Sequence, residues 1–163
     1  MRFVDVRNLI GKAFCDYLLT GDINFRNLYL SVEVPKEFEN YKRERVTFYE
    51  TFISGYKNFI PAKGCKEVVL LARVLNNKGY YFEAHEVVEK FWLRCDCPEK
   101  KLLQAVIQTA IANMHLENRN LKSYSRMKEL ALENLKPYRG VICTVEVENL
   151  KEELRKERGF LKF

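Results

Sequence analysis

The stretch of sequence that decides the fold reads Tyr80-Tyr81-Phe82-Glu83-Ala84-His85-Glu86-Val87-Val88-Glu89-Lys90-Phe91-Trp92. A helix turns by about 100° per residue, so one side of a helix here collects apolar residues together with two polar ones. The members of this side are Tyr81, Phe82, His85, Val88, Glu89 and Trp92. Glu86 falls at the edge of the side, and Glu83 is expected to point away from it. The pattern predicts a helix over residues 80–94 with an imidazole and a carboxylate inside its apolar face.

The carboxylate on this face needs a partner. Burying an unpaired carboxylate in apolar surroundings costs several kcal/mol, so Glu89 should be paired, protonated or open to a cavity. His85 lies one helical turn away and is the nearest candidate. Trp92 is expected in the core, with its indole N–H aimed at Glu89.

The next predicted helix, over residues 99–117, carries a matching polar stripe that contains Gln104, Gln108 and His115. About four residues join the two helices, and so short a connection makes them pack antiparallel. Counting outward from the turn places Gln104 level with Glu89, and Gln108 level with His85. At roughly 1.5 Å per residue, His115 lies about 10 Å beyond Gln108, so a simple hairpin does not bring it to His85.

Three interpretations of this polar cluster remain open. In the first, the histidine, the glutamate and the two glutamines satisfy one another as a buried hydrogen-bond network. In the second, they line a cleft that binds a ligand or carries out catalysis. In the third, the four-residue spacing of His85 and Glu89 holds a metal ion, although two ligands are fewer than a zinc site needs.

The remaining sequence also favours helices. Seven glycines and four prolines leave few tight turns for a many-stranded sandwich. Apolar residues at three- and four-residue spacing predict further helices over residues 5–19, 36–59, 66–77, 121–136 and 147–157. Residues 28–34 resemble a strand without a partner, so an extended connection closed by Pro35 is expected there.

We therefore predict an all-α protein that forms one structural domain with two parts. Residues 66–163 form a compact antiparallel helical bundle that carries the His–Glu and Gln–His motifs. Residues 1–65 form an N-terminal helical extension packed on that bundle.

Composition excludes several classes of protein. A hydrophobic fraction of 47% with 31% charged residues is typical of a globular domain and not of a disordered chain. No apolar run reaches the roughly 18 residues of a membrane span, and charge follows the first residue too closely for a secretory signal. A cytoplasmic location is therefore expected. The net charge of +6 tolerates an acidic partner without indicating nucleic acid.

The cysteines and one basic segment are secondary signals. The five cysteines are odd in number and scattered, so reduced thiols are expected, and Cys95 and Cys97 are interpreted as incidental. The segment Lys42-Arg43-Glu44-Arg45, close to three aromatic residues, is compatible with a surface for single-stranded nucleic acid. The helical spacing of those aromatic residues favours packing in the core instead.

Two separated motifs in this sequence resemble a known family. The stretch Glu83 to Trp92, followed by Leu103-Gln104, Ile107-Gln108, Ala110 and His115, is similar to the "EAHExxExxW" and "LQxxIQxAxA" helices of the family domain of unknown function 309. The resemblance covers about residues 66–138. It implies a compact helical bundle, small in prokaryotic members, with no settled activity. The matching positions are Glu83, His85, Glu86, Glu89, Trp92, Gln104, Gln108 and His115.

The chain departs from the family at one visible place. Similar sequences often have Gly-Ala a few residues after the Asn120 position, where this chain has Ser123-Tyr124-Ser125. The helix that follows Asn120 is therefore expected to pack less closely.

The leading hypothesis for function is a polar pocket that binds a small polar ligand or carries out acid–base chemistry. His85, together with Glu86 and Glu89, forms the predicted catalytic group, because an imidazole titrates near neutral pH. The predicted ligand-binding residues are Gln104, Gln108, Trp92 and His115. No cofactor and no metal ion are indicated, no nucleophile is identifiable, and the question of enzyme activity stays open.

The alternative is a non-catalytic module that binds a protein or nucleic acid. In that case the His/Glu/Gln cluster is a buried structural network. A homo-oligomer is compatible with either hypothesis.

Overall fold

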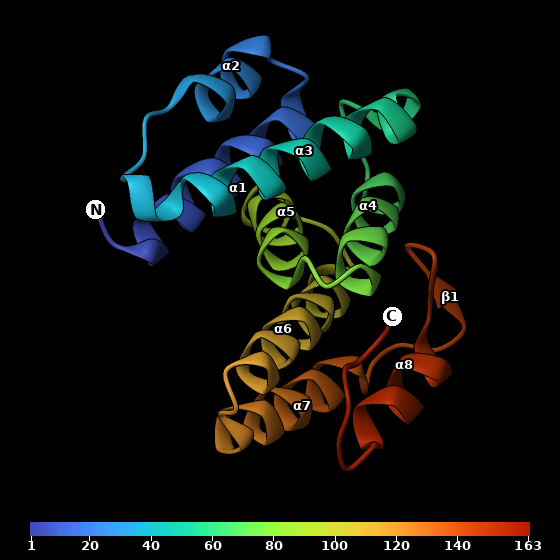
Figure 1. Ribbon diagram of the computed structural model, residues 1–163. Coiled ribbons are helices and arrows are strands. Elements are labelled where there is room, and N and C mark those ends of the chain that lie inside the picture. Colours follow the sequence, from blue (N-terminus) through green and yellow to red (C-terminus); the bar gives the residue numbers. More distant parts are fainter. The chain divides into compact units, whose positions relative to one another are not determined.

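The computed structural model describes residues 1–163 and divides the chain into two compact units, Met1–Lys63 and Gly64–Phe163. Eight α-helices and one small two-stranded sheet form the regular structure (Figure 1), which confirms the predicted all-α class. None of these helices combines the length and the apolar character that crossing a membrane requires. The packing of residues 1–65 on the bundle stays a prediction.

The first unit contains α1 (Phe3–Thr20), α2 (Ile23–Ser31) and α3 (Glu39–Tyr56), with short 3-10 turns at Lys36–Phe38 and Lys57–Phe59. Its core is aromatic. Phe14 of α1 stacks on Tyr49 of α3 with 4.0 Å between ring centroids. Tyr29 of α2 meets Tyr49 edge-on at 5.4 Å. These rings account for much of the apolar contact among the three helices.

The expectation of an extended connection over residues 28–34 is wrong for its first half, because α2 continues through Ser31. The Asp22 side chain begins this helix by accepting the backbone N–H of Asn24 at 2.9 Å. The strand-like pattern came from alternating residues, and Leu28 and Leu30 of that pattern are exposed. The predicted helix over residues 36–59 is confirmed in its middle, while both ends tighten into 3-10 turns.

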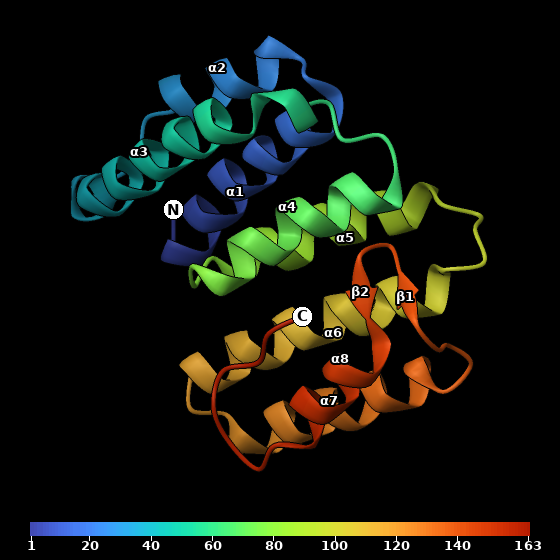
Figure 2. The same ribbon diagram turned by 90° about the vertical axis from the view of Figure 1, so that its right-hand side faces the viewer.

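The second unit is built from α4 (Cys65–Asn77), α5 (Tyr81–Arg94), α6 (Lys100–Glu117), α7 (Leu121–Leu135) and α8 (Val147–Arg155). The first four helices lie side by side, each antiparallel to the next, as Figure 2 shows. The connections between them are short, and helices joined by short connections pack antiparallel. Fully buried leucines at 71, 75, 102, 103 and 135 fill the space between these helices. This confirms the predicted antiparallel bundle.

A hairpin that the sequence did not indicate follows α7. Its strands are β1 (Val141–Ile142) and β2 (Val145–Glu146). The turn residues Cys143 and Thr144 have φ of 48° and 65°, the left-handed conformation that the favoured two-residue hairpin turns require. Because neither residue is Gly, Asn or Asp, the usual turn signal is missing from the sequence.

Four of the five cysteines are paired, so the expectation of reduced, incidental thiols is wrong. Cys65 at the start of α4 is bonded to Cys143 in the hairpin turn, and Cys95 to Cys97 in the connection between α5 and α6. The Cα atoms of Cys65 and Cys143 lie 5.5 Å apart at a sequence separation of 78. Only tertiary contacts bring such distant residues together, and scattered cysteines do not reveal their pairing.

Candidate functional site

Three polar side chains of α5 form the candidate site. The helix follows Gly79, whose φ of 86° lets the chain turn back from α4. His85, Glu86 and Glu89 occupy positions i, i+1 and i+4 of this helix. The His85 and Glu86 side chains are 12% and 10% exposed, whereas that of Glu89 is 45% exposed. The site is therefore sheltered at its histidine and open at Glu89.

The imidazole of His85 lies close to both carboxylates. Its Nε2 is 3.5 Å from Glu86 Oε2 and 3.7 Å from Glu89 Oε2. The other oxygen of Glu86, Oε1, lies 4.0 Å from Lys90 Nζ. One nitrogen or oxygen from each of the three site residues lies within 4.8 Å of the others. The three groups thus converge on one small region of the helix surface.

This arrangement permits two kinds of chemistry. Imidazole nitrogen and carboxylate oxygen are both ligands for divalent metal ions, and three such groups on one helix leave further coordination positions open. The same groups accept hydrogen bonds from a polar or cationic ligand and can exchange protons with it. His85, Glu86 and Glu89 are therefore the residues that could hold a metal ion.

The predicted orientation of Glu83 is wrong, because its side chain is fully buried instead of pointing away from the apolar face. Glu86, expected at the edge of the apolar face, is buried as well. The helix packs against α4 on one side and α6 on another, so a wide arc of α5 is covered. An amphipathic pattern predicts that charged residues face solvent, and this prediction is wrong for a helix that is covered by neighbours on more than one side.

The two glutamines do not bond to the His85 cluster. Gln108 Oε1 accepts a hydrogen bond from Asn134 Nδ2 of α7 at 2.9 Å, and Gln104 is half-buried. Because α6 lies between α5 and α7, its polar residues have two possible partners. The helix register alone did not identify which partner Gln108 takes.

Trp92 is bonded differently from the expectation. Its Nε1–H donates to the carbonyl oxygen of Lys100 at 3.1 Å and not to Glu89. The Lys100 ammonium lies 4.7 Å from the Trp92 ring centroid. Trp92 thus ties the end of α5 to the start of α6. His115 is half-buried near the end of α6.

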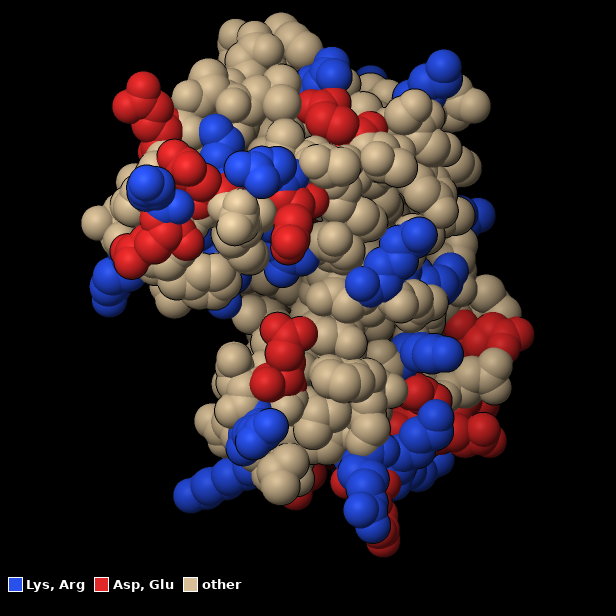
Figure 3. All heavy atoms as spheres, viewed as in Figure 1, with Lys and Arg blue, Asp and Glu red and all other residues tan.

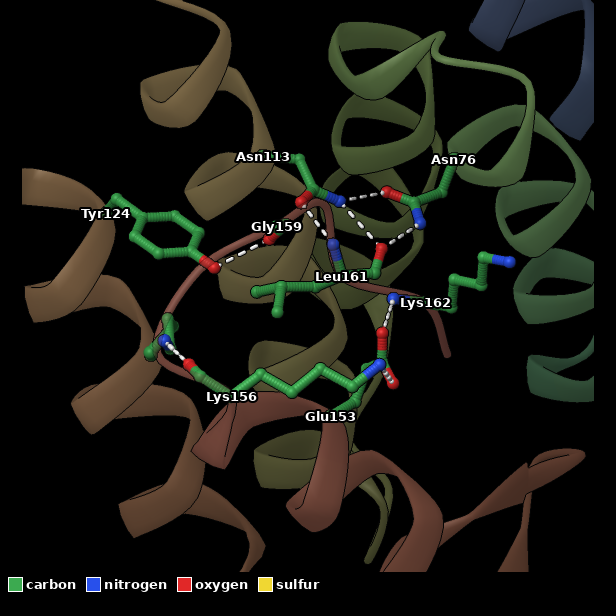
Figure 4. A network of polar contacts seen from close by, with 9 residues as sticks. Asn76, Asn113, Tyr124, Glu153, Lys156, Gly159, Leu161 and Lys162 are labelled. Carbon is green, nitrogen blue, oxygen red and sulfur yellow. Dashed lines mark hydrogen bonds and ion pairs between the residues drawn. The ribbon is translucent and has the colours of Figure 1, made fainter. Parts of the chain in front are cut away.

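A second group of buried polar residues was not expected from the sequence. Asn76 of α4, Asn113 of α6 and Lys128 of α7 are buried, and all three hydrogen-bond to the chain after α8. Figure 4 shows Asn76 and Asn113 with their partner Leu161. The one feature of the sequence that could have indicated this group is Asn113, because it is a polar residue among the apolar residues of α6. A buried amide at such a position requires partners.

The basic segment of α3 takes part in packing within the first unit. Lys42 Nζ donates to the carbonyl oxygens of Leu30 and Val32 at the end of α2. The Phe3 ring meets Tyr41 edge-on at 4.7 Å. On the face shown in Figure 3, basic and acidic residues are interspersed, as on a solvated surface. Nucleic-acid binding stays a prediction.

The fold and the site define a helical-bundle domain with a His-Glu-x-x-Glu face on α5. Residues 69–127 match the family described as "Domain of unknown function (DUF309)". The matched segment contains the whole of α5 and α6, and the predicted family resemblance is confirmed. A comparison with curated proteins and with solved structures gives no match.

Proposed function

We propose that the unit Gly64–Phe163 binds a small polar ligand through His85, Glu86 and Glu89, and that the ligand carries a positively charged or hydrogen-bond-donating group. The observation that carries this proposal is the convergence of one imidazole and two carboxylates within 4.8 Å on α5. A ligand amine, guanidinium or metal ion could contact the imidazole and both carboxylates in this region.

Charge favours such a ligand. Two carboxylates share the region with one imidazole, and Lys90 lies 4.0 Å from the oxygen of Glu86 that faces away from His85. Attraction between opposite charges strengthens where water is partly excluded, as it is around the sheltered His85 and Glu86 side chains. The more exposed Glu89 gives the ligand its access.

Acid–base chemistry is the reaction class that these groups support. An imidazole both donates and accepts a proton near neutral pH, and Glu89 can orient it from one turn away. Gln104, Gln108, Trp92 and His115 remain predicted ligand-binding residues, and enzyme activity remains a prediction. Gln108 and Trp92 are already engaged with Asn134 and Lys100, which weakens their part in the proposal.

A second candidate function is a non-catalytic interaction module in which the same cluster is structural. It is favoured by the low exposure of His85 and Glu86, at 12% and 10%. A cytoplasmic location and a prokaryotic source also stay predictions, and the pairing of four cysteines weighs against a strongly reducing compartment.

Thermal unfolding in the presence of small ligands tests the first proposal. The compounds are primary amines, polyamines, guanidinium compounds, Mn²⁺ and Zn²⁺. At a concentration about 100-fold above Kd, a ligand adds about 2.7 kcal/mol to stability and raises the melting temperature by several degrees. Glu89→Gln, which removes one negative charge, should abolish that rise. The exposed Glu133→Gln on α7 is the matched control and should keep it.

His85→Ala separates the two candidate functions. A structural cluster should lose about 2–4 kcal/mol of unfolding free energy, because the substitution leaves a sheltered carboxylate without its neighbour. A ligand site should lose less than about 1 kcal/mol. If no compound raises the melting temperature and His85→Ala is strongly destabilising, the ligand proposal is wrong and the module is supported.

A further inference from the structure

The chain after α8 packs on α4, α6 and α7, and the surface around Asn76, Asn113 and Tyr124 that holds it is called the groove here. Residues 156–163 have no regular secondary structure, yet Leu161 is only 1% exposed. Its backbone N–H donates to Asn113 Oδ1 at 2.7 Å. Its carbonyl oxygen accepts from Asn76 Nδ2 and Asn113 Nδ2, each at 2.9 Å (Figure 4). The side-chain amides of Asn76 and Asn113 therefore bind both the N–H and the carbonyl oxygen of Leu161.

Further contacts extend this recognition in both directions from Leu161. The Tyr124 hydroxyl donates to the carbonyl oxygen of Gly159 at 2.7 Å. The Phe160 ring stacks on Tyr81, with ring centroids 5.3 Å apart and an interplanar angle of 13°. Arg73 Nε donates to the carbonyl oxygen of Phe163 at 2.6 Å. Backbone hydrogen bonds with pockets for single side chains are the usual way in which proteins bind an extended peptide.

The groove is made by helices that have a core of their own. Asn76, Asn113 and Tyr124 come from α4, α6 and α7, and leucines at positions 71, 75, 102, 103 and 135 pack these helices together. The segment that fills the groove, residues 159–163, is called the tail here, and it is joined to α8 by Lys156, Glu157 and Arg158, all of which are exposed. The tail packs on helices that also contact one another directly. Further hydrogen bonds hold the chain on either side of Leu161, because Lys128 donates to the Lys156 carbonyl oxygen and Glu153 accepts the Lys162 N–H.

An empty groove would be unfavourable. Asn76 and Asn113 are 2% and 0% exposed, and apart from each other their main partner is the backbone of Leu161. Without that backbone, buried amide groups would lose their hydrogen bonds. The groove therefore needs an occupant, and the sequence that fits it is the one seated in it.

We propose that this groove is a peptide-binding site that accepts residues 159–163 of a second copy of the chain in place of its own. The exchange reuses every contact described above, because the incoming segment is identical. At low concentration the tethered tail occupies its own groove, since a short tether gives an effective concentration in the millimolar range. This site differs from the His85 cluster and does not depend on the function proposed for it.

Two variants with complementary defects test the exchange. Leu161→Asp places a charge at the buried position of the tail, so this variant has a functional groove but a tail that does not bind. The double variant Asn76→Ala, Asn113→Ala lacks the amides that hold the tail, so it has a functional tail but no functional groove. Mixed in equal amounts at about 0.5 mM, where binding between copies competes with tethering, they should form a heterodimer. Light scattering after size exclusion should show a doubling of the 19.4 kDa mass of one chain. Each variant alone should remain a monomer.

The matched control mixes Leu161→Asp with the triple variant that carries all three substitutions and offers neither a usable tail nor a usable groove. That mixture should stay monomeric. A monomeric mixture of the complementary pair, with helical circular dichroism retained in both variants, overturns the proposal. So does dimer formation in the control mixture, because the contact would then lie elsewhere.

Amide hydrogen exchange of the unaltered chain provides the measurement if either variant fails to fold. Exchange of a tail requires that it leave its groove while the helices stay folded. The Leu161 amide, bonded to Asn113 Oδ1, should therefore exchange at least about tenfold faster than the amides in the middle of α6. Equal rates would mean that the tail leaves only when the whole bundle unfolds, and tail exchange would be ruled out.

Discussion

His85, Glu86 and Glu89 converge because of their positions along a single helix. Side chains at i and i+4 of an α-helix lie within reach of each other whatever packs around the helix. The 3.7 Å distance between His85 Nε2 and Glu89 Oε2 follows from this spacing. The exposure of the residues does not, since it depends on neighbouring elements. At the scale of the residue, proximity within a helix is predictable and burial is not.

Asn76 gives a prediction at the same scale. Asn76→Ala removes, in a buried position, the hydrogen bond that Asn76 donates to the Leu161 carbonyl oxygen and the one that it accepts from Asn113 Nδ2. We expect a loss of about 1–3 kcal/mol in the free energy of unfolding, measured by urea denaturation. Asn77→Ala, one residue further on and exposed, is the control and should change stability by less than about 0.5 kcal/mol. Equal losses in the two variants would contradict the importance of the network.

Tyr29 gives a prediction about pH. Burial, and then the neighbouring Glu50 carboxylate, raise the pKa of the Tyr29 hydroxyl far above its ordinary value of 10.0. Above that pH the unfolded chain releases this proton while the folded chain keeps it. Stability should therefore fall with rising pH, by up to about 1.4 kcal/mol per pH unit for this one group.

Tyr29→Phe tests this dependence, because phenylalanine has no proton to release. Urea unfolding of the variant between about pH 9.5 and 11 should show a shallower decline than the unaltered protein. The variant also loses the hydrogen bond from the Tyr29 hydroxyl to Glu50 Oε1, so only the slope is diagnostic. Identical slopes would show that Tyr29 ionises normally.

At the scale of the element, helix signals were reliable where they were local. The periodicity of apolar residues located α4 to α7. The last of these helices begins after Asn120, whose side chain accepts the Ser123 N–H at 3.1 Å. The strand-like run at residues 28–34 misled because α2 buries little except Tyr29. A short helix with one buried residue shows almost no helical periodicity.

The cap of α7 can be tested directly. Asn120→Ala removes the side-chain acceptor for the Ser123 N–H and should lower the free energy of unfolding by about 1 kcal/mol. Asn118→Ala, two residues earlier and also exposed, removes no such bond and serves as the control. Thermal unfolding monitored by circular dichroism measures both variants. A loss as large in Asn118→Ala would show that the cap is not responsible.

At the scale of the whole molecule, long-range contacts decide how the second unit is closed. The bond from Cys65 to Cys143 joins the start of α4 to the hairpin after α7. The tail then returns from α8 to Asn76 of α4 and Asn113 of α6. Both features connect segments that are far apart in the sequence, and neither leaves a periodic pattern.

The Cys65–Cys143 bond should stabilise the second unit. A crosslink at a sequence separation of 78 lowers the entropy of the unfolded chain, which corresponds to about 4.5 kcal/mol of stability at room temperature. Replacing both cysteines by serine should therefore lower the urea midpoint clearly. The same replacement at Cys95 and Cys97, whose separation is 2, is the control and should lower the free energy of unfolding by less than about 2 kcal/mol. Comparable losses would contradict this entropic explanation.

By itself, the sequence determined that this chain is all-α, where most of its helices lie, and that His85 and Glu89 share one face of α5. These features depend on contacts between residues a few positions apart. The tertiary structure alone decided that Glu83 is buried, that Gln108 bonds to Asn134, which cysteines pair, and that Asn76 and Asn113 hold the tail. Each depends on which distant segment packing places opposite a given side chain, and helical periodicity carries no information about that choice.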